Sequence, residues 1–319
     1  MKLEDIRKIA AQSNFTPEEN APELVHRKLR EMGLEPGEFY QELEMSSRYV
    51  ETHQDISYAQ TPVSLHSHTY YEILYCRDVG DVEYLVEAER YRLQKGDVVI
   101  VPPGISHKPM LPQHMTQPYI RDVMWVSHEL AERMKDIWHG DEEFPLSVPR
   151  LLRTAETRWE FLGDMFRNGV RESERREAGW EAAVLGNSIQ LLTYLIRAIQ
   201  DRSSKALRAE KPELLDEVLA FVESHLAEKL TLGDVAKHFW VSQSTITQTF
   251  RNKMGVSFYR LVTQRRLIAA KLLILDGGSL EDVGRMVGFT DYSTFYRAFK
   301  QEFGISPRQF RKKQESSES

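Results

Sequence analysis

The hydrophobic and polar positions follow two different periodicities along this chain of 319 residues. Between about residues 50 and 150, turn residues separate short runs rich in β-branched and aromatic side chains: YVETHQ, EILYC, DVEYLVEAERYRL and DVVIVPP. That pattern is typical of an all-β barrel or jelly roll. In the last hundred residues the apolar positions recur every three or four residues, as on the buried face of a helix. We therefore predict an α+β multidomain chain in which an all-helical domain follows the β-barrel.

The helical part contains one motif twice. The segment TLGDVAKHFWVSQSTITQTFRNKMGVS, which begins at Thr231, returns from Ser279 as SLEDVGRMVGFTDYSTFYRAFKQEFGISP. Most apolar positions match at a separation of 48 residues, and after one inserted residue they match at 49. A repeat of this kind indicates one supersecondary unit used twice, here a helix, a tight turn and a second helix over 231–254 and 279–303. The commonest use of that unit is reading the major groove of DNA.

Residues suited to cap helices stand at matching places in the two copies. They are Thr231, Ser279 and Asp291 at helix starts, and Gly255 and Gly304 at helix ends. Between the copies, SFYRLVTQRRLIAAKLLILDGG predicts one helix of roughly 18 residues, which spans about 27 Å. The two second helices would then lie about one DNA turn apart, near 34 Å, so that one chain reads two successive major-groove segments.

The segment from about Lys211 to Lys313 resembles the DNA-binding region of the AraC/XylS family of transcription regulators. Its end, VGFTDYSTFYRAFKQEFGISPRQFR, is similar to the signature of that family along its whole length. The resemblance implies a DNA-binding domain over residues 212–314 that contains both helix–turn–helix motifs.

On each second helix, the face opposite the apolar stripe carries side chains suited to DNA. These are Gln243, Ser244, Thr247, Gln248 and Arg251 in the first copy, and Tyr292, Ser293, Tyr296, Arg297 and Lys300 in the second. Glutamine can bond adenine in a bidentate manner, and arginine can bond guanine in the same way. Tyrosine and threonine can contact thymine methyls or phosphates. We predict that these ten residues bind DNA.

Charge is distributed unevenly between the two parts of the chain. From Ala206 onward there are 17 basic and 14 acidic residues, net +3, whereas residues 1–205 hold 25 basic and 34 acidic residues, net −9. This asymmetry favours a DNA-binding C-terminal domain attached to a domain with another role. Because +3 is weakly basic, we expect phosphate contacts from local clusters such as Arg265–Arg266 and Arg311–Lys313.

Two segments of the β-rich region carry candidate metal ligands. In HSHTYYE, His66, His68 and Glu72 stand at even spacing, so in a continuous strand all three would point to one face. GDVVIVPPGISH then adds His107 after a turn. Together they resemble the two cupin motifs, although Gln60 stands where the family has a glycine and Leu111 where it has an asparagine.

The resemblance leaves two roles open for this cluster of three histidines and one glutamate. In metal-binding cupins these positions hold one divalent ion, and the ligand types suit Zn, Ni, Mn or Fe. In cupin-type sensor domains of AraC-like regulators, such residues often line an effector pocket without a metal. We expect an effector or metal pocket formed by His66, His68, Glu72 and His107.

The rest of the chain suggests further divisions. Residues 1–48 read as an acidic helical arm, 49–150 as the cupin-like barrel and 203–211 as a linker. Residues 151–202 predict two amphipathic helices, LLRTAETRWEFLGDMF and WEAAVLGNSIQLLTYLIRAIQ. The apolar stripe of the second comprises Val184, Leu191, Leu192, Leu195, Ile196 and Ile199. Part of that stripe can pack on the barrel, and the rest is a candidate interface for a homodimer, as the resemblance also implies.

We expect a cytoplasmic protein that is not bound to a membrane. The N-terminal MKLEDIRKIA lacks a secretory apolar region, and no apolar run reaches the length of a membrane span. Because the chain contains a single cysteine, Cys76, it cannot form an intrachain disulfide. We expect Cys76 to be a small buried residue rather than a reactive thiol.

These features predict a one-component transcription regulator, for example an activator, that binds double-stranded promoter or operator DNA as a homodimer. A small molecule, such as a sugar or a related metabolite, would bind in the barrel and change how the DNA domains are presented, and RNA polymerase is a further candidate partner. The alternative from another class is a metal-dependent cupin enzyme, a dioxygenase or sugar isomerase with an accessory DNA-binding domain. A third reading is a constitutive architectural binder with an empty barrel. We favour a protein without enzymatic activity, because no general base or nucleophile can be identified beside the cluster.

Overall fold

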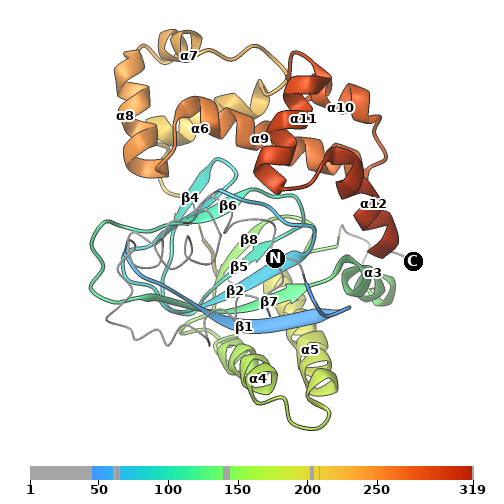
Figure 1. The fold of residues 1–319 in the computed structure, drawn as a ribbon. Coiled ribbons are helices and arrows are strands. Elements are labelled where there is room, and N and C mark those ends of the chain that lie inside the picture. Colours follow the sequence, from blue (N-terminus) through green and yellow to red (C-terminus); the bar gives the residue numbers. More distant parts are fainter. Residues whose placement is uncertain are drawn as a thin grey trace, which may run out of the picture.

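The computed structural model describes residues 45–59, 63, 65–138, 144–201, 205–207 and 209–317. Figure 1 shows a β domain with helices on one side of it and a helical domain on the other. We use "β domain" for residues 45–207 and "helical domain" for residues 209–317. The predicted N-terminal arm and Gln60 lie outside the described residues, apart from the last four positions of the arm.

The β domain consists of two sheets that enclose one core. The larger sheet has the order β1 (Val50–Ser57), β7 (Tyr119–Val126), β2 (Tyr71–Asp78), β5 (Asp97–Val101), β8 (Arg150–Arg153) and β9 (Lys205–Ala206). The smaller sheet has the order β4 (Glu89–Arg92), β3 (Glu83–Val86) and β6 (His107–Met110). Val99 and Trp125 of the larger sheet and Tyr84 and Val86 of the smaller one belong to the same buried cluster. All pairings are antiparallel, so side chains alternate between this core and the outer faces.

Three helices cover the outer face of the larger sheet: α3 (His128–Ile137), α4 (Leu162–Arg175) and α5 (Trp180–Gln200). Ile73 and Ile100 of the sheet share a core with Phe166 of α4 and Leu191 of α5. Among the described helices, α5 is the one whose length and composition would allow it to cross a membrane. Its apolar stripe is buried against this sheet, which is the arrangement of a core helix.

The helical domain contains two successive helix pairs. It is formed by α6 (Leu214–Ser224), α7 (Leu232–His238), α8 (Gln243–Met254), α9 (Phe258–Leu275), α10 (Leu280–Met286), α11 (Tyr292–Phe303) and α12 (Pro307–Ser317). The first pair, α7 and α8, has a core around Ile246 and Phe250, and the second, α10 and α11, has a separate core around Phe295 and Phe299. The long helix α9 contributes residues to both cores and thereby joins them.

The predicted caps explain most of these boundaries. The Thr231 and Asp291 side chains accept hydrogen bonds from the backbone N–H groups of Asp234 and Thr294, and both helices start where expected. Gly255 and Gly304 end α8 and α11 with left-handed backbone. Ser279 differs, because it precedes α10 but its side chain accepts no capping hydrogen bond.

Three other expectations are corrected by the structure. Residues 151–153, expected to begin a helix, belong to β8, because Leu151 and Leu152 pair with Val99 and Val98 of β5. The helix α4 therefore begins later than expected, at Leu162. The strand expected from His66 to Glu72 is not continuous: β2 begins only at Tyr71, and His66 forms an isolated bridge with His107.

The apolar stripe of α5 is the third correction. Val184, Leu191, Leu192, Leu195 and Ile196 are all buried within the β domain, and Ile199 packs against the same core. These residues face the sheet and not a second copy of the chain. The outward side of α5 presents Ile189, whose exposed fraction is 37%.

Candidate functional site

The expected histidine and glutamate cluster assembles despite the broken strand. Glu72 lies on β2, His107 begins β6, and His66 and His68 lie on the segment before β2. The His66–His107 bridge brings this segment to the edge of the smaller sheet. Ligand atoms of His66, Glu72 and His107 lie within 4.8 Å of one another. The local fold thus brings His66, Glu72 and His107 together, with His68 beside Glu72, although not by the predicted strand alternation.

Glu72 is the centre of the cluster. Its Oε2 atom lies 3.1 Å from His107 Nε2 and 3.7 Å from His68 Nε2. Its Oε1 atom accepts a hydrogen bond of 3.0 Å from the indole N–H of Trp125 on β7. Burial alone would raise the pKa of this carboxyl, but the neighbouring His107 and His68 outweigh burial and hold its pKa well below the usual value. The lowered pKa favours the ionised form of Glu72.

Both histidines beside Glu72 have a fixed ring orientation. The Nδ1 atoms of His68 and His107 lie 2.6 Å and 2.9 Å from the carbonyl oxygens of Tyr70 and Ile105. Because a carbonyl only accepts, each Nδ1 carries the proton and each Nε2 is turned toward Glu72. Stacking on the Tyr70 ring, at 4.3 Å between centroids, also holds His68. Such backbone contacts are the usual way in which proteins orient metal-binding histidines.

A divalent ion fits these residues. His107 Nε2 and Glu72 Oε2 lie 3.1 Å apart, close enough for both to be ligand atoms of one ion. His68 Nε2 is buried and, among the described residues, has no hydrogen-bond partner, since 3.7 Å exceeds hydrogen-bond length. Burial lowers the pKa of His68, which favours the neutral ring that binds metal ions. The candidate ligands are thus His66, Glu72 and His107, with His68 adjacent to them.

The predicted DNA-contacting side chains lie on the outside of α8 and α11. Nine of the ten are exposed, and Tyr296 is half-buried beside Tyr292 at 6.1 Å between ring centroids. Thr247 and Arg297 bond backbone carbonyls of their own helices, those of Gln243 and Ser293. The β domain covers neither face, so both are accessible to a duplex.

Three arginines of the basic clusters expected to bind phosphate instead bond backbone carbonyls of the protein. Arg265 is buried and donates to the carbonyl oxygen of Glu87 in the β domain. Arg266 donates to the carbonyl oxygens of Leu226 and Glu228. Arg311 bonds the carbonyl oxygen of Gly278. These guanidinium groups fasten neighbouring segments together, which a count of charges along the sequence cannot reveal.

One exposed residue was missed by the sequence analysis. Trp240, in the turn between α7 and α8, has an exposed fraction of 94% and left-handed backbone with φ of 56°. It stands two residues before Ser242, whose side chain caps α8. The available signal was the match of Trp240 to Gly288 in the second copy, since a left-handed turn position favours glycine.

Two family models match separate parts of the chain. Residues 48–158 match the family model described as an AraC-like ligand binding domain, and residues 235–313 match one described as a helix-turn-helix domain. The chain is 25% identical to the arabinose operon regulatory protein of Escherichia coli over 70% of this chain and 75% of that protein. It is 26% identical to the xylose operon regulatory protein of Haemophilus influenzae, over 48% of this chain and less than half, 41%, of that protein. Among solved structures, the C-terminal domain of AraT from Geobacillus stearothermophilus is 27% identical, with a TM-score of 0.31, over 32% of this chain and 86% of that domain.

Proposed function

Because this chain belongs to the AraC family of DNA-binding transcription regulators, with a ligand-binding domain before its helix–turn–helix domain, we propose that it is a one-component switch. A small molecule, in our proposal a sugar or a related metabolite, binds at His66, His68, Glu72 and His107 and changes DNA binding by α8 and α11. The similarity to arabinose and xylose operon regulators favours a sugar. Because we assign the cluster a sensing role, we propose that the protein is a regulator and not an enzyme.

The observation that carries this proposal is the presence of two different sites in one chain. The β domain holds a buried group of ionisable residues around Glu72, which His107 and Trp125 contact. The helical domain presents exposed polar faces on two helices that α9 joins. We assign the β domain a cupin-like jelly roll and the helix pairs two DNA-reading motifs, over 231–254 and 279–303.

A divalent ion, Zn, Ni, Mn or Fe, is our proposal for the centre of the cluster. His66, Glu72 and His107 would hold it through two ring nitrogens and one carboxylate oxygen. When bound, the ion would offer a Lewis-acid contact to hydroxyl or carboxylate oxygens of an effector. The chain's own part is to orient the rings through Ile105 and Tyr70 and to keep Glu72 ionised beside Trp125.

We further propose that the active form is a cytoplasmic homodimer on promoter or operator DNA, where it activates transcription through contact with RNA polymerase. A homodimer is the commonest closed assembly of a soluble protein. Because the apolar stripe of α5 is buried in the β domain, we place the contact with a second copy of the chain on the outward side of α5, around Ile189.

Binding-site selection tests the proposal. The full chain should enrich a sequence with two contacted segments about one helical turn apart. The affinity for that sequence should change with a member of a sugar panel in the wild type but not in a His66→Ala/His107→Ala variant. Elemental analysis of the same preparations separates the metal-binding form of the pocket from a pocket without metal.

A further inference from the structure

The interior face of the larger sheet continues beyond Glu72 and carries a buried arginine. The register of β2 and β7 pairs Glu72 with Trp125 and Cys76 with Arg121. Residues paired in this way point to the same side of a sheet, and so do residues two or four positions apart on one strand. Trp125 and Cys76 both belong to the core between the two sheets. Arg121 therefore points into the same interior as Glu72, with its backbone about 14 Å from that of Trp125 along β7.

The guanidinium group of Arg121 has more hydrogen-bond donors than its contacts use. Only 13% of its side chain is exposed. It donates to the hydroxyl oxygen of Ser57 at 3.0 Å and to the Oδ2 atom of Asp55 at 2.9 Å, and it lies 4.8 Å from the centroid of the Tyr119 ring. A guanidinium group has five N–H groups. These two hydrogen bonds to described residues leave up to three N–H groups for a ligand.

Arg121 is held in its charged form. Burial alone would lower the pKa of its guanidinium group, but Asp55 and, more weakly, Glu72 outweigh burial and raise that pKa. Among the described residues, Asp55 is the one carboxylate that forms an ion pair with Arg121, and 39% of the Asp55 side chain is exposed. The interior thus holds a permanent positive charge whose negative partner is shared with solvent.

Tyr84 of the smaller sheet faces the same interior from the opposite side. Its side chain belongs to the same core as Trp125, and its ring centroid lies 6.2 Å from that of His107. Burial raises the pKa of the Tyr84 hydroxyl well above its usual value, Glu72 raises it further, and Arg121 lowers it. The hydroxyl of Tyr84 is therefore within electrostatic reach of both the cluster around Glu72 and the guanidinium of Arg121.

We propose that the effector is a sugar acid, whose carboxylate binds Arg121 and whose hydroxyl groups reach Tyr84 and the cluster around Glu72. The inference rests on the proposed function and names the class of ligand for the same interior. A guanidinium group donates two parallel hydrogen bonds to a carboxylate, and these are stronger than hydrogen bonds to a neutral hydroxyl group. A phosphate would place up to two negative charges beside Asp55, so a carboxylate is the better match.

Titration calorimetry of the full chain with matched ligands tests this assignment. Each set contains a neutral hexose, its uronate and its 6-phosphate, which differ only in the group on carbon 6; glucose, galactose and mannose provide three sets. In at least one set the uronate should bind about 10- to 150-fold more tightly than the hexose, the range for hydrogen bonds to a charged group. Equal affinity of hexose and uronate in every set, or a 6-phosphate that binds more tightly than its uronate, overturns the assignment.

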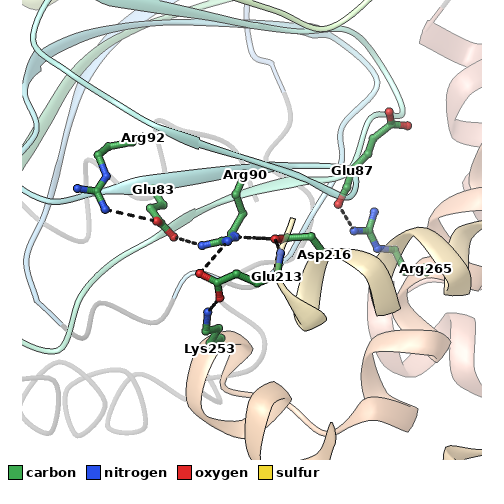
Figure 2. A network of polar contacts seen from close by, with 8 residues as sticks. All are labelled: Glu83, Glu87, Arg90, Arg92, Glu213, Asp216, Lys253 and Arg265. Atoms are coloured by element: carbon green, nitrogen blue, oxygen red, sulfur yellow. Dashed lines mark hydrogen bonds and ion pairs between the residues drawn. The ribbon is translucent and has the colours of Figure 1, made fainter. Parts of the chain in front are cut away.

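Two variants with matched chemistry show whether Arg121 is the group that recognises the carboxylate. Arg121→Gln should remove the preference for the uronate. Arg92→Gln should keep it, because Arg92 is 62% exposed and lies beside Glu83, on the side of the smaller sheet opposite to Tyr84 (Figure 2). A uronate preference that survives Arg121→Gln would mean that another group binds the carboxylate, and the assignment is then wrong.

Asp55→Asn separates a ligand contact from a purely structural ion pair. It breaks the same pair as Arg121→Gln but leaves the guanidinium in place, so it should strengthen binding of the uronate and leave binding of the hexose unchanged. If the pair served only the fold, both variants would weaken the two ligands alike, and that result overturns the assignment. Arg121→Lys keeps the charge without the bidentate geometry, and it should retain part of the preference even if Arg121→Gln fails to fold.

Failure of this inference is distinguishable from failure of the proposed function. A hexose that binds at least as tightly as its uronate and changes DNA affinity overturns the assignment of Arg121 alone. If no neutral or acidic sugar binds the full chain, the proposed sugar effector fails, and the assignment of Arg121 fails with it.

Discussion

Trp240 and Gly288 hold the same place in the two helix pairs, and both have left-handed backbone, with φ of 56° and 92°. Their surroundings differ. The Trp240 side chain is almost fully exposed, whereas a Cβ atom at Gly288 would lie 2.2 Å from the carbonyl oxygen of Leu226. The second position thus requires glycine for both backbone and space, while the first carries a tryptophan that the packing of the domain does not explain.

Replacing Trp240 and replacing Gly288 should change the free energy of unfolding in opposite directions. Left-handed backbone destabilises the folded state by about 1–2 kcal/mol for a residue other than glycine. Glycine avoids this strain, but the greater conformational entropy that it loses on folding costs about 0.5–1 kcal/mol. Trp240→Gly should therefore raise the free energy of unfolding by about 0.5–1 kcal/mol. Gly288→Ala should lower it by about 2 kcal/mol or more, through strain and the clash with Leu226. Urea denaturation of both variants provides the test, and a loss of stability in Trp240→Gly would show that the tryptophan has packing contacts of its own.

The DNA-reading faces predict two kinds of effect. Arg297→Ala and Gln248→Ala should each weaken binding to the selected site by about 1–3 kcal/mol and relax the preference at one or two base pairs. Lys300→Ala should weaken binding to all sequences and lower the salt slope by about one unit. Arg285→Ala is the matched control, because Arg285 is an exposed arginine of α10 that pairs with Asp282. Fluorescence anisotropy at several salt concentrations measures the DNA affinity of all four variants. If Arg297→Ala keeps the base preference of the wild type, the outward face of α11 does not read bases.

The helix boundaries could be predicted because their causes are local. Thr231, Asp291, Gly255 and Gly304 act within a few residues of their own positions. The β8 strand could not, because Leu151 and Leu152 are strand residues only through pairing with β5, more than 50 positions earlier. Pairing between distant segments overrides local helical periodicity.

The candidate pocket was predictable by residue type but not by geometry. The spacing of His66, His68 and Glu72 identified the residues, yet it is the bridge from His66 to His107 that assembles them. The contact of Arg90 with Asp216 joins positions 126 apart and has no signal in the sequence. For the same reason, the sequence suggested that Arg265 binds phosphate, whereas in the structure it donates to the Glu87 carbonyl oxygen and forms an ion pair with Glu223.

Cys76 should make stability fall at high pH. Burial raises the pKa of its thiol to about 12, from an ordinary value of 9.0. Between these values the native chain keeps a proton that the unfolded chain loses, so the free energy of unfolding falls as pH rises, by up to about 1.4 kcal/mol per pH unit. Cys76→Ala should show a shallower decline between pH 9 and 11 in urea denaturation. Equal slopes in the two proteins would mean that the thiol ionises in the native state. Consistent with burial, the native thiol should react only slowly with thiol reagents at neutral pH.

The two sides of α5 should respond differently to charge. Leu195→Asp places a carboxylate in the core of the β domain and should unfold it. Ile189→Asp changes the exposed side, so the monomer should stay folded while the proposed dimer dissociates. Circular dichroism and sedimentation of the full chain distinguish the two outcomes. A dimer that survives Ile189→Asp unchanged would place the interface elsewhere than on this side of α5.

The most direct measurement of the central claim is the affinity of the full chain for its selected DNA sequence, with and without members of a sugar panel. It should be made in parallel on the wild type and on His66→Ala/His107→Ala. We predict that at least one sugar changes the wild-type dissociation constant by about 5-fold or more, the lower end of usual coupling between sites, and leaves that of the variant unchanged. An equal response to that sugar in both proteins would contradict the claim that the cluster around Glu72 controls DNA binding.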